Sequence, residues 1–165
     1  HLAEDARITP DAGEGASLRL PSYVPYRLSV TSNKASSLIA KAYQARFGLT
    51  IWEWRVIAVL GEGAAMTAQA VCEATAMDKV SVSRAIRALD ERGLVMRIRN
   101  KQDRRASDVS LTAEGQAIYA EVAPLALNYE KKLLEAFTDA ERDQLMSLLD
   151  KLEAQLDEVG QAFDR

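Results

Sequence analysis

The sequence predicts a mainly helical fold with one small β-hairpin. Residues 78–92 carry apolar side chains at helical spacing, which predicts a short helix with one buried stripe and one polar face. Residues 94–99 and 108–111 alternate apolar and polar positions around a polar loop, which predicts a hairpin. Long segments with helical periodicity lie before and after this unit. The expected architecture is a winged helix-turn-helix core, with long N- and C-terminal helices suited to dimerisation.

Positive charge is concentrated in this helix and hairpin. Between Lys79 and Arg105 the net charge is +6, whereas the 165-residue chain carries −3 and the remainder therefore −9. A pI near 5.3 argues against a protein that binds nucleic acid over its whole surface. A basic island on an acidic body is typical of a protein that contacts phosphates with one face. Charge alone leaves open a merely solvated surface, but the coincidence of the island with the helix and hairpin favours DNA binding.

Composition excludes several other classes of protein. The chain is 48% hydrophobic and 27% charged, which is ordinary for a globular protein. It has no apolar run near the roughly 18 residues of a membrane span and no signal-peptide pattern, so we expect a cytoplasmic protein without a membrane partner. The single cysteine, Cys72, cannot form an internal disulfide. With only that cysteine and His1, we expect neither a metal site nor a cofactor.

The first half of the chain divides at capping residues and glycines. Residues 1–24 lack periodicity and are expected to form an N-terminal arm, followed by a first dimerisation helix over residues 25–48 that ends at Gly48. Thr50 and Glu53 form a capping box that opens a helix to about Gly61, in which Trp52 is expected to be largely buried. Short helices starting after Thr67 and Asp78 complete the helix-turn-helix. The winged DNA-binding core is expected to span residues 49–112.

In the hairpin, alternation predicts one buried face. We expect Leu94, Met96 and Ile98 on that face, with Arg97 and Arg99 on the outer face.

Residues 113–165 are expected to form two C-terminal helices for dimerisation. The first should run from Thr112 through Phe137, with a kink at Pro124, and the second should open at a capping box formed by Thr138 and Glu141. Apolar residues of the second helix recur at spacings of three and four, as in a coiled coil. They are Leu145, Leu148, Leu149, Leu152, Leu156 and Val159. A hairpin between the two helices of one chain is possible, but we favour a seam shared by two chains.

The order of elements and three segments resemble the MarR family of bacterial transcriptional regulators. The segment DRRASDVSLT, residues 103–112, is similar to the wing signature D-x-R-x-x-x-V-x-L-T of that family. SVSRAIRALDERGLVMR and LTIWEWRVIAVL resemble its recognition helix and second helix, and the resemblance covers about residues 25–160.

This resemblance implies a homodimer that binds double-stranded DNA at a pseudo-palindromic operator. It further implies a repressor that releases DNA when a small molecule, often phenolic, binds. Some family members sense oxidants through a cysteine near the first helix. Here that helix has none, and Cys72 is more consistent with a small core residue.

Arg84 is the first candidate for base contact. It lies in the middle of the polar helix face, and an Arg fork on guanine O6 and N7 supplies about 1–3 kcal/mol of discrimination. A phosphate contact or a surface ion pair is the alternative. The other recognition-helix candidates position the protein more than they specify sequence. They are Lys79, Ser81, Ser83 and Arg87.

The wing supplies a second set of candidates. Arg104 and Arg105 lie at the hairpin tip, where guanidinium groups can enter a narrow minor groove, unless the tip is merely a solvated loop. Asp103, or Asp78 from the helix, would hold one of them by a salt bridge. The remaining wing candidates are Arg97, Arg99 and Lys101, of which Arg97 and Arg99 either meet phosphates or pair with Asp108.

An effector pocket is implied between the dimer helices and the winged core. Aromatic walls and a cation suit an aromatic carboxylate. The candidates are Tyr26, Arg27, Tyr43, Trp52, Trp54 and Arg55. The alternative for each is an ordinary core or structural role.

Two alternative functions are less consistent with the sequence. A winged-helix protein-interaction module without direct DNA readout would need apolar residues on the outward helix face, where only Val80 qualifies. An enzyme is not expected, because the chain has no Gly-rich phosphate loop, no serine elbow and no histidine beyond position 1.

Overall fold

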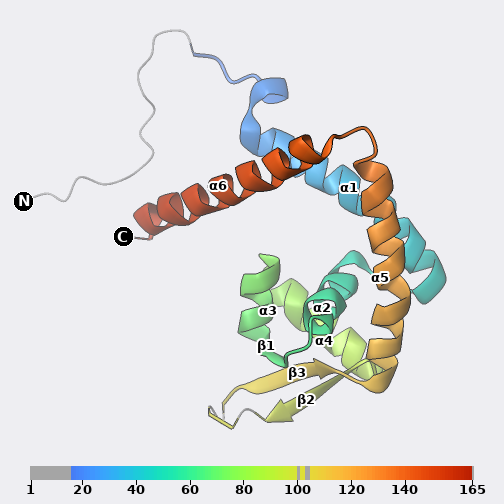
Figure 1. The fold of residues 1–165 in the computed structure, drawn as a ribbon. Coiled ribbons are helices and arrows are strands. Elements are labelled where there is room, and N and C mark those ends of the chain that lie inside the picture. Colours follow the sequence, from blue (N-terminus) through green and yellow to red (C-terminus); the bar gives the residue numbers. More distant parts are fainter. Residues whose placement is uncertain (1–15, 100, 103–104, 165) are drawn as a thin grey trace, which may run out of the picture. The chain divides into compact units, whose positions relative to one another are not determined.

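The computed structural model describes residues 16–99, 101–102 and 105–164, and these form helices and a small antiparallel sheet (Figure 1). The contacts divide the chain into two compact units, and residues 24–130 form the larger one. In chain order the elements are η1 (Leu20–Ser22), α1 (Val24–Phe47), α2 (Ile51–Gly61), β1 (Met66–Thr67), α3 (Ala68–Thr75), α4 (Lys79–Glu91), β2 (Val95–Arg99), β3 (Ser107–Leu111), α5 (Ala113–Leu133) and α6 (Asp139–Phe163). The predicted fold class is confirmed.

The helices of the core begin where capping residues predicted. The Thr50 side chain accepts from the Glu53 amide and the Glu53 carboxylate accepts from the Thr50 amide, which completes the capping box of α2. Thr67 and Asp78 cap α3 and α4 in the same way with one hydrogen bond each to a backbone amide. Their apolar faces meet in one cluster, whose fully buried members include Val56, Ile57, Val71, Val82 and Leu89.

Within α2 one burial expectation was wrong. Trp52 is 45% exposed, and Glu53 beside it is buried instead. The capping box accounts for the position of Glu53, because its carboxylate accepts from the Thr50 amide.

The sheet has three strands in the order β1–β3–β2, all antiparallel. Strand β1 was not predicted, since two residues are too short to show alternation. Its Met66 pairs with Val109 of β3, while the other edge of β3 pairs with β2. The sheet therefore joins the start of α3 to the hairpin.

In β2 the buried face is the opposite of the one expected. Met96 and Ile98 are 46% and 48% exposed, whereas Val95 is buried together with Val109. The reason is that Gly93, at φ +71°, ends the helix and the Leu94 amide still donates to the Leu89 carbonyl. Leu94 is thus buried in the helix cap, and strand alternation starts one residue later. In consequence Arg97, which pairs with Val109, lies on the same face of the sheet as that buried valine and not on the outer face where it was expected.

The C-terminal segments follow the predicted caps. The Thr112 hydroxyl oxygen accepts from the Gly115 amide at the start of α5. Helix α5 ends at Leu133, earlier than the predicted end at Phe137. Thr138 and Glu141 form the second capping box. In α6 no residue is buried, and Leu145, Leu148 and Leu156 are exposed. In the described part of the chain, no helix is long and apolar enough to cross a membrane.

Gly115 is required by the close approach of α5 to the end of α4. A Cβ atom at this position would meet the Leu94 carbonyl oxygen, whereas a Cβ at Gly160 in α6 would meet nothing within 4 Å. We predict that Gly115→Ala lowers the free energy of unfolding by about 1–3 kcal/mol, the usual effect of overpacking. The matched variant Gly160→Ala should raise it by about 0.5–1 kcal/mol through helix propensity. Urea denaturation at fixed protein concentration measures both, and equal effects would contradict this packing.

Candidate nucleic-acid interface

Asp78 and Ser81 fix the N-terminal end of α4. One carboxylate oxygen of Asp78 accepts from the Ser81 amide at 2.8 Å, and the other accepts from the Ser81 hydroxyl at 2.7 Å. The hydroxyl bond and then the amide bond lower the pKa of Asp78 below its ordinary value, so this carboxyl is ionised at neutral pH. Because its proton is given to Asp78, the Ser81 hydroxyl has only acceptor capacity left for any other group.

The two faces of α4 differ sharply. Val82, Ala85, Ile86 and Leu89 are buried in the core. Positions at spacings of three and four on the opposite side form a single exposed stripe, which we call the outer stripe of α4. It consists of Val80, Ser83, Arg84 and Arg87, and Lys79 lies exposed beside it.

Hollows border α4 on both sides. One of about 470 Å³ is lined by Ala68, Gln69, Cys72, Lys79 and Ser83, between α3 and α4. Another of about 250 Å³ lies on the α2 side and includes Trp52, Ser81 and Arg84 in its lining. Between these hollows the residues of the outer stripe are exposed. Cys72 itself is half-buried and packs against the core.

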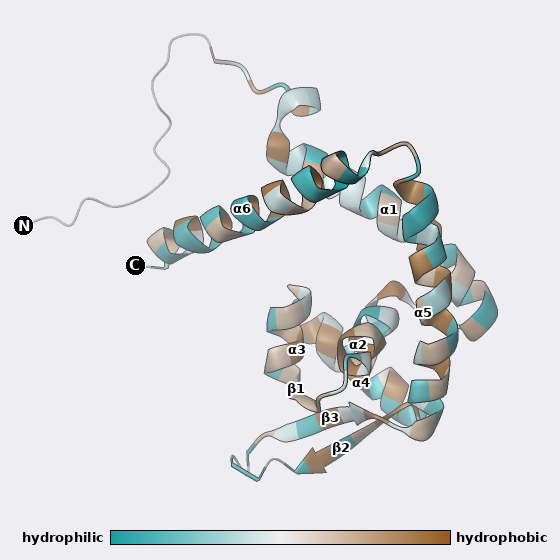
Figure 2. Cartoon of the chain, viewed as in Figure 1, coloured by the Kyte–Doolittle hydropathy of each residue, from teal (hydrophilic) through white to brown (hydrophobic). Residues whose placement is uncertain are grey.

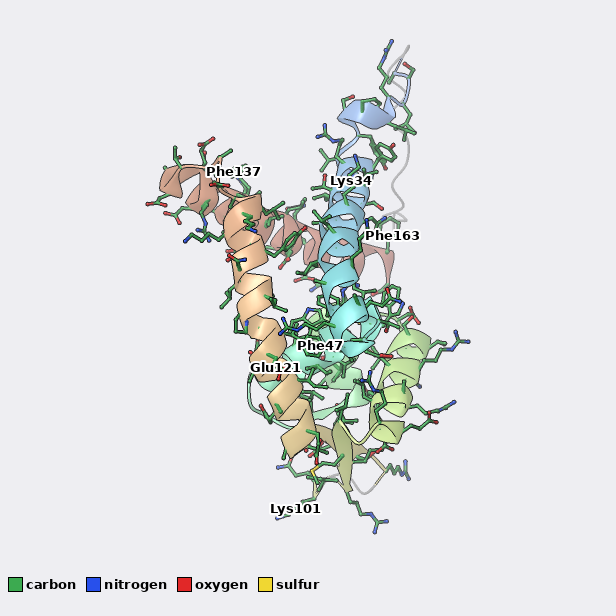
Figure 3. All side chains as sticks on the ribbon, turned by 90° about the vertical axis from the view of Figure 1, so that its right-hand side faces the viewer. Lys34, Phe47, Lys101, Glu121, Phe137 and Phe163 are labelled. Carbon is green, nitrogen blue, oxygen red and sulfur yellow. The ribbon has the colours of Figure 1, made fainter. Side chains whose placement is uncertain are left out.

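The hairpin extends from the core as an arm with a polar end (Figures 1 and 2). Arg99, Lys101 and Arg105 are all exposed, and Lys101 points away from the ribbon in Figure 3. The predicted tip residues Asp103 and Arg104 lie outside the described residues. The structure therefore places Lys101 and Arg105 near the hairpin end but does not describe the predicted Asp103 salt bridge.

Two cations of the basic island serve the fold itself. The Arg92 guanidinium donates to the Phe47 carbonyl at 2.8 Å and to the Gly48 carbonyl at 3.3 Å, which ties the end of α4 to the end of α1. Arg97 lies 3.8 Å from the Asp90 carboxylate, so its partner is on α4. Both groups are about half exposed, and such a pair adds little stability. Sequence alone did not distinguish these two arginines from those that face solvent.

The aromatic residues predicted to line a pocket fall into two groups. Tyr43 is buried, its ring centroid lies 5.5 Å from that of Trp54, and Trp54 in turn stacks on Tyr119 at 6.4 Å. Burial chiefly raises the pKa of Tyr43, with the Arg55 charge opposing it, so the phenol is neutral at pH 7. These rings are part of the packing between α1, α2 and α5.

Arg55 on α2 contacts the exposed Trp52 ring and the Ser36 hydroxyl of α1. Its guanidinium lies 5.4 Å from the ring centroid of Trp52 and donates to the Ser36 hydroxyl at 3.4 Å. Tyr26 and Arg27, by contrast, lie in the first turn of α1, about 26 Å along the helix from Tyr43. Those two can share a pocket with Tyr43 only if a second copy of the chain supplies them.

Among the described residues, no group of His, Cys, Asp and Glu side chains is placed to hold a metal ion.

Comparison with known proteins identifies the family. The profile of the MarR family matches residues 47–106. A MarR/EmrR family transcriptional regulator from Acinetobacter sp. ADP1 has a similar crystal structure, with a TM-score of 0.79, 31% sequence identity, and coverage of 86% of this chain and 99% of that one.

Two further proteins are similar. The homoprotocatechuate degradative operon repressor of Escherichia coli is 28% identical over 106 residues, which cover 64% of this chain and 72% of the repressor. The structure of Bordetella bronchiseptica BpsR, described with the regulation of its DNA binding by 6-hydroxynicotinic acid, has a TM-score of 0.73 and 25% identity, covering 84% of this chain and 98% of that one. The chain has a helix-turn-helix and a basic hairpin, and it is 31% identical to the Acinetobacter regulator over nearly the whole length of that protein. This chain therefore belongs to the MarR family of transcriptional regulators.

Proposed function

We propose that this chain is a sequence-specific DNA-binding repressor that acts as a homodimer on a pseudo-palindromic operator. The observation that carries the proposal is the outer stripe of α4, which is uncovered, basic and held in one orientation by the buried opposite face. The N-terminal part of such a helix enters the major groove, while a hairpin beside it follows the backbone or the minor groove. The similarity to a degradative operon repressor supports repression. Such a protein acts where the chromosome is, in the cytoplasm.

The exposed cations divide by position. Arg84, in the middle of the outer stripe, is the proposed base-reading residue through guanine O6 and N7. Lys79, Ser83 and Arg87 on α4, with Arg99, Lys101, Arg104 and Arg105 on the hairpin, are the proposed phosphate and minor-groove contacts. Ser81 is proposed only as a hydrogen-bond acceptor, because Asp78 already holds its proton.

A homodimer is supported by the uncovered apolar residues of α6. Leu145, Leu148 and Leu156 recur on one helix at coiled-coil spacing and are exposed, which is unfavourable in a lone chain. Two-fold symmetry would place two α4 helices on half-sites about one helical turn apart, roughly 34–36 Å.

Salt dependence and Arg84 variants test the DNA-binding proposal. With about 6–10 phosphates contacted by a dimer, affinity for a selected operator should fall on the order of 10³–10⁵-fold between 50 and 200 mM salt. Arg84→Lys should keep this salt slope but lose about 1–3 kcal/mol of discrimination at one base pair, because an ammonium lacks the guanidinium fork. Lys101→Ala should weaken binding to all sequences alike and reduce the slope by about one. Fluorescence anisotropy over a salt series measures all three.

Arg19→Ala, at an exposed residue that precedes α1, is the control and should bind DNA as the wild type does. Affinity that does not respond to salt, or that Arg84→Lys leaves unchanged at every base pair, would refute DNA readout and favour the protein-interaction module. That module would retain its partner when Arg84 and Arg105 are reversed in charge.

We further propose that a small aromatic carboxylate binds near Arg55 and weakens DNA binding. Arg55 and Trp52 offer a cation beside an exposed aromatic face, and Tyr43 and Trp54 lie next to them. The ligand regulation described for BpsR supports this class of ligand. Tyr26 and Arg27 would join the pocket from the partner chain.

Titration calorimetry with 6-hydroxynicotinic acid and a series of hydroxybenzoic acids tests the pocket. At least one acid should bind and release the operator, and Arg55→Gln should abolish its binding by removing the charge that faces the carboxylate. The matched control is Arg46→Gln. The Arg46 guanidinium lies 5.6 Å from the Phe47 ring centroid, which is a similar cation–π contact on α1 rather than on α2. Equal losses in both variants would argue against a site at Arg55.

A further inference from the structure

We propose that Val80 reads the C5-methyl group of a thymine in the major groove, which makes it a specificity-determining residue beside Arg84. This inference rests on the proposed DNA-binding function and specifies what one position of α4 recognises. The partner of Val80 is an A·T base pair of duplex DNA.

The first observation is the placement of Val80. Its side chain is 59% exposed, although it is a branched apolar residue on a helix face that is otherwise polar and basic. It starts the outer stripe of α4 and is the second residue of the helix, in the turn that a recognition helix places against base edges. The core beneath α4 is filled by Val82, Ala85, Ile86 and Leu89, so the fold has no use for an apolar side chain at position 80.

The second observation is the charge around it. Lys79 is next to Val80 in sequence, and Arg84 and Arg87 follow it along the stripe. A docked protein would have to cover these cations together with the valine, whereas duplex DNA supplies phosphates for cations and a methyl group for the valine. In the major groove the C5-methyl of thymine is the apolar group that distinguishes A·T from the other pairs.

Ser81 adds a matching polar contact. Because its hydroxyl proton is held by Asp78, Ser81 presents an acceptor. An A·T pair displays in the major groove both a thymine methyl and the donor amino group of adenine. Val80 and Ser81 together therefore fit A·T, because G·C offers a donor amino group on cytosine but no methyl group for the valine.

Helix geometry sets the position of this base pair. Val80 and Arg84 are four residues apart, which is about 6 Å along the helix axis. Base pairs are stacked about 3.4 Å apart. The thymine should therefore lie within two base pairs of the guanine that Arg84 contacts.

The test removes the methyl group from the DNA and the isopropyl group from the protein. An operator is selected from random duplexes with the wild-type chain, and each thymine of one half-site is replaced in turn by deoxyuridine, which pairs identically but lacks the methyl. Affinities are measured for the wild type, Val80→Ala and Leu18→Ala. Leu18 is the matched control, since it is an exposed aliphatic residue (69%) that precedes α1 and lies outside the helices proposed to form the dimer. Val80→Ala should not lower the melting temperature, because the side chain is exposed and alanine favours a helix.

We expect one thymine, within two base pairs of the guanine that Arg84→Lys no longer discriminates, whose replacement weakens wild-type binding about fourfold, the effect of one buried methyl group. Val80→Ala should not respond to that replacement, and Leu18→Ala should respond as the wild type does. The inference is overturned if no uridine substitution weakens wild-type binding, or if Val80→Ala remains equally sensitive. A chain that binds duplex DNA without sequence preference also overturns it but leaves phosphate binding intact, and a chain that binds no duplex refutes the proposed function itself.

Discussion

The burial of one face of α4 is the constraint on which the interface depends. Val82, Ile86 and Leu89 are nearly inaccessible to solvent, and full burial of such side chains is worth about 1.5–3 kcal/mol each. Rotation of α4 about its axis would expose them, so the helix has one stable orientation. The outer stripe is the consequence of that orientation. The salt bridge between Arg97 and Asp90 contributes far less than this, since both groups are about half exposed.

A second constraint joins α4 to the hairpin and to α5 within a few residues. The Leu94 amide donates to the Leu89 carbonyl, and the Leu94 carbonyl accepts from the Thr112 amide. The Thr112 hydroxyl donates to the Gly93 carbonyl at 2.6 Å while it caps α5. With Gly115 packed on Leu94, this junction fixes where the hairpin leaves the core. The position of the hairpin relative to α4 thus depends mainly on this junction, to which the half-exposed pair between Arg97 and Asp90 adds little.

Local signals in the sequence predicted most of the fold. Thr50, Thr67, Asp78 and Thr138 cap helices where expected, because capping depends on a side chain and an amide three residues away. The prediction for the buried face of β2 was wrong because Leu94 was counted as a strand residue. Leu94 is apolar because it is buried at the C-terminal cap of α4. The contacts of Arg92 with the end of α1 span 44 and 45 residues, and no local pattern reports a contact at that separation. For the same reason, the sequence did not show that Tyr26 and Tyr43 lie too far apart to line one pocket. Aromatic character alone does not indicate the distance between two residues along a helix.

Chemical footprinting of the selected operator tests the central claim most directly. If two α4 helices lie in the major groove, guanine N7 should be protected from methylation by the wild type in two patches about one helical turn apart, roughly 10–10.5 base pairs. In each patch one guanine should regain reactivity with Arg84→Ala. A single patch, or N7 protection that does not depend on Arg84, would contradict a paired helix-turn-helix that reads bases from the outer stripe of α4.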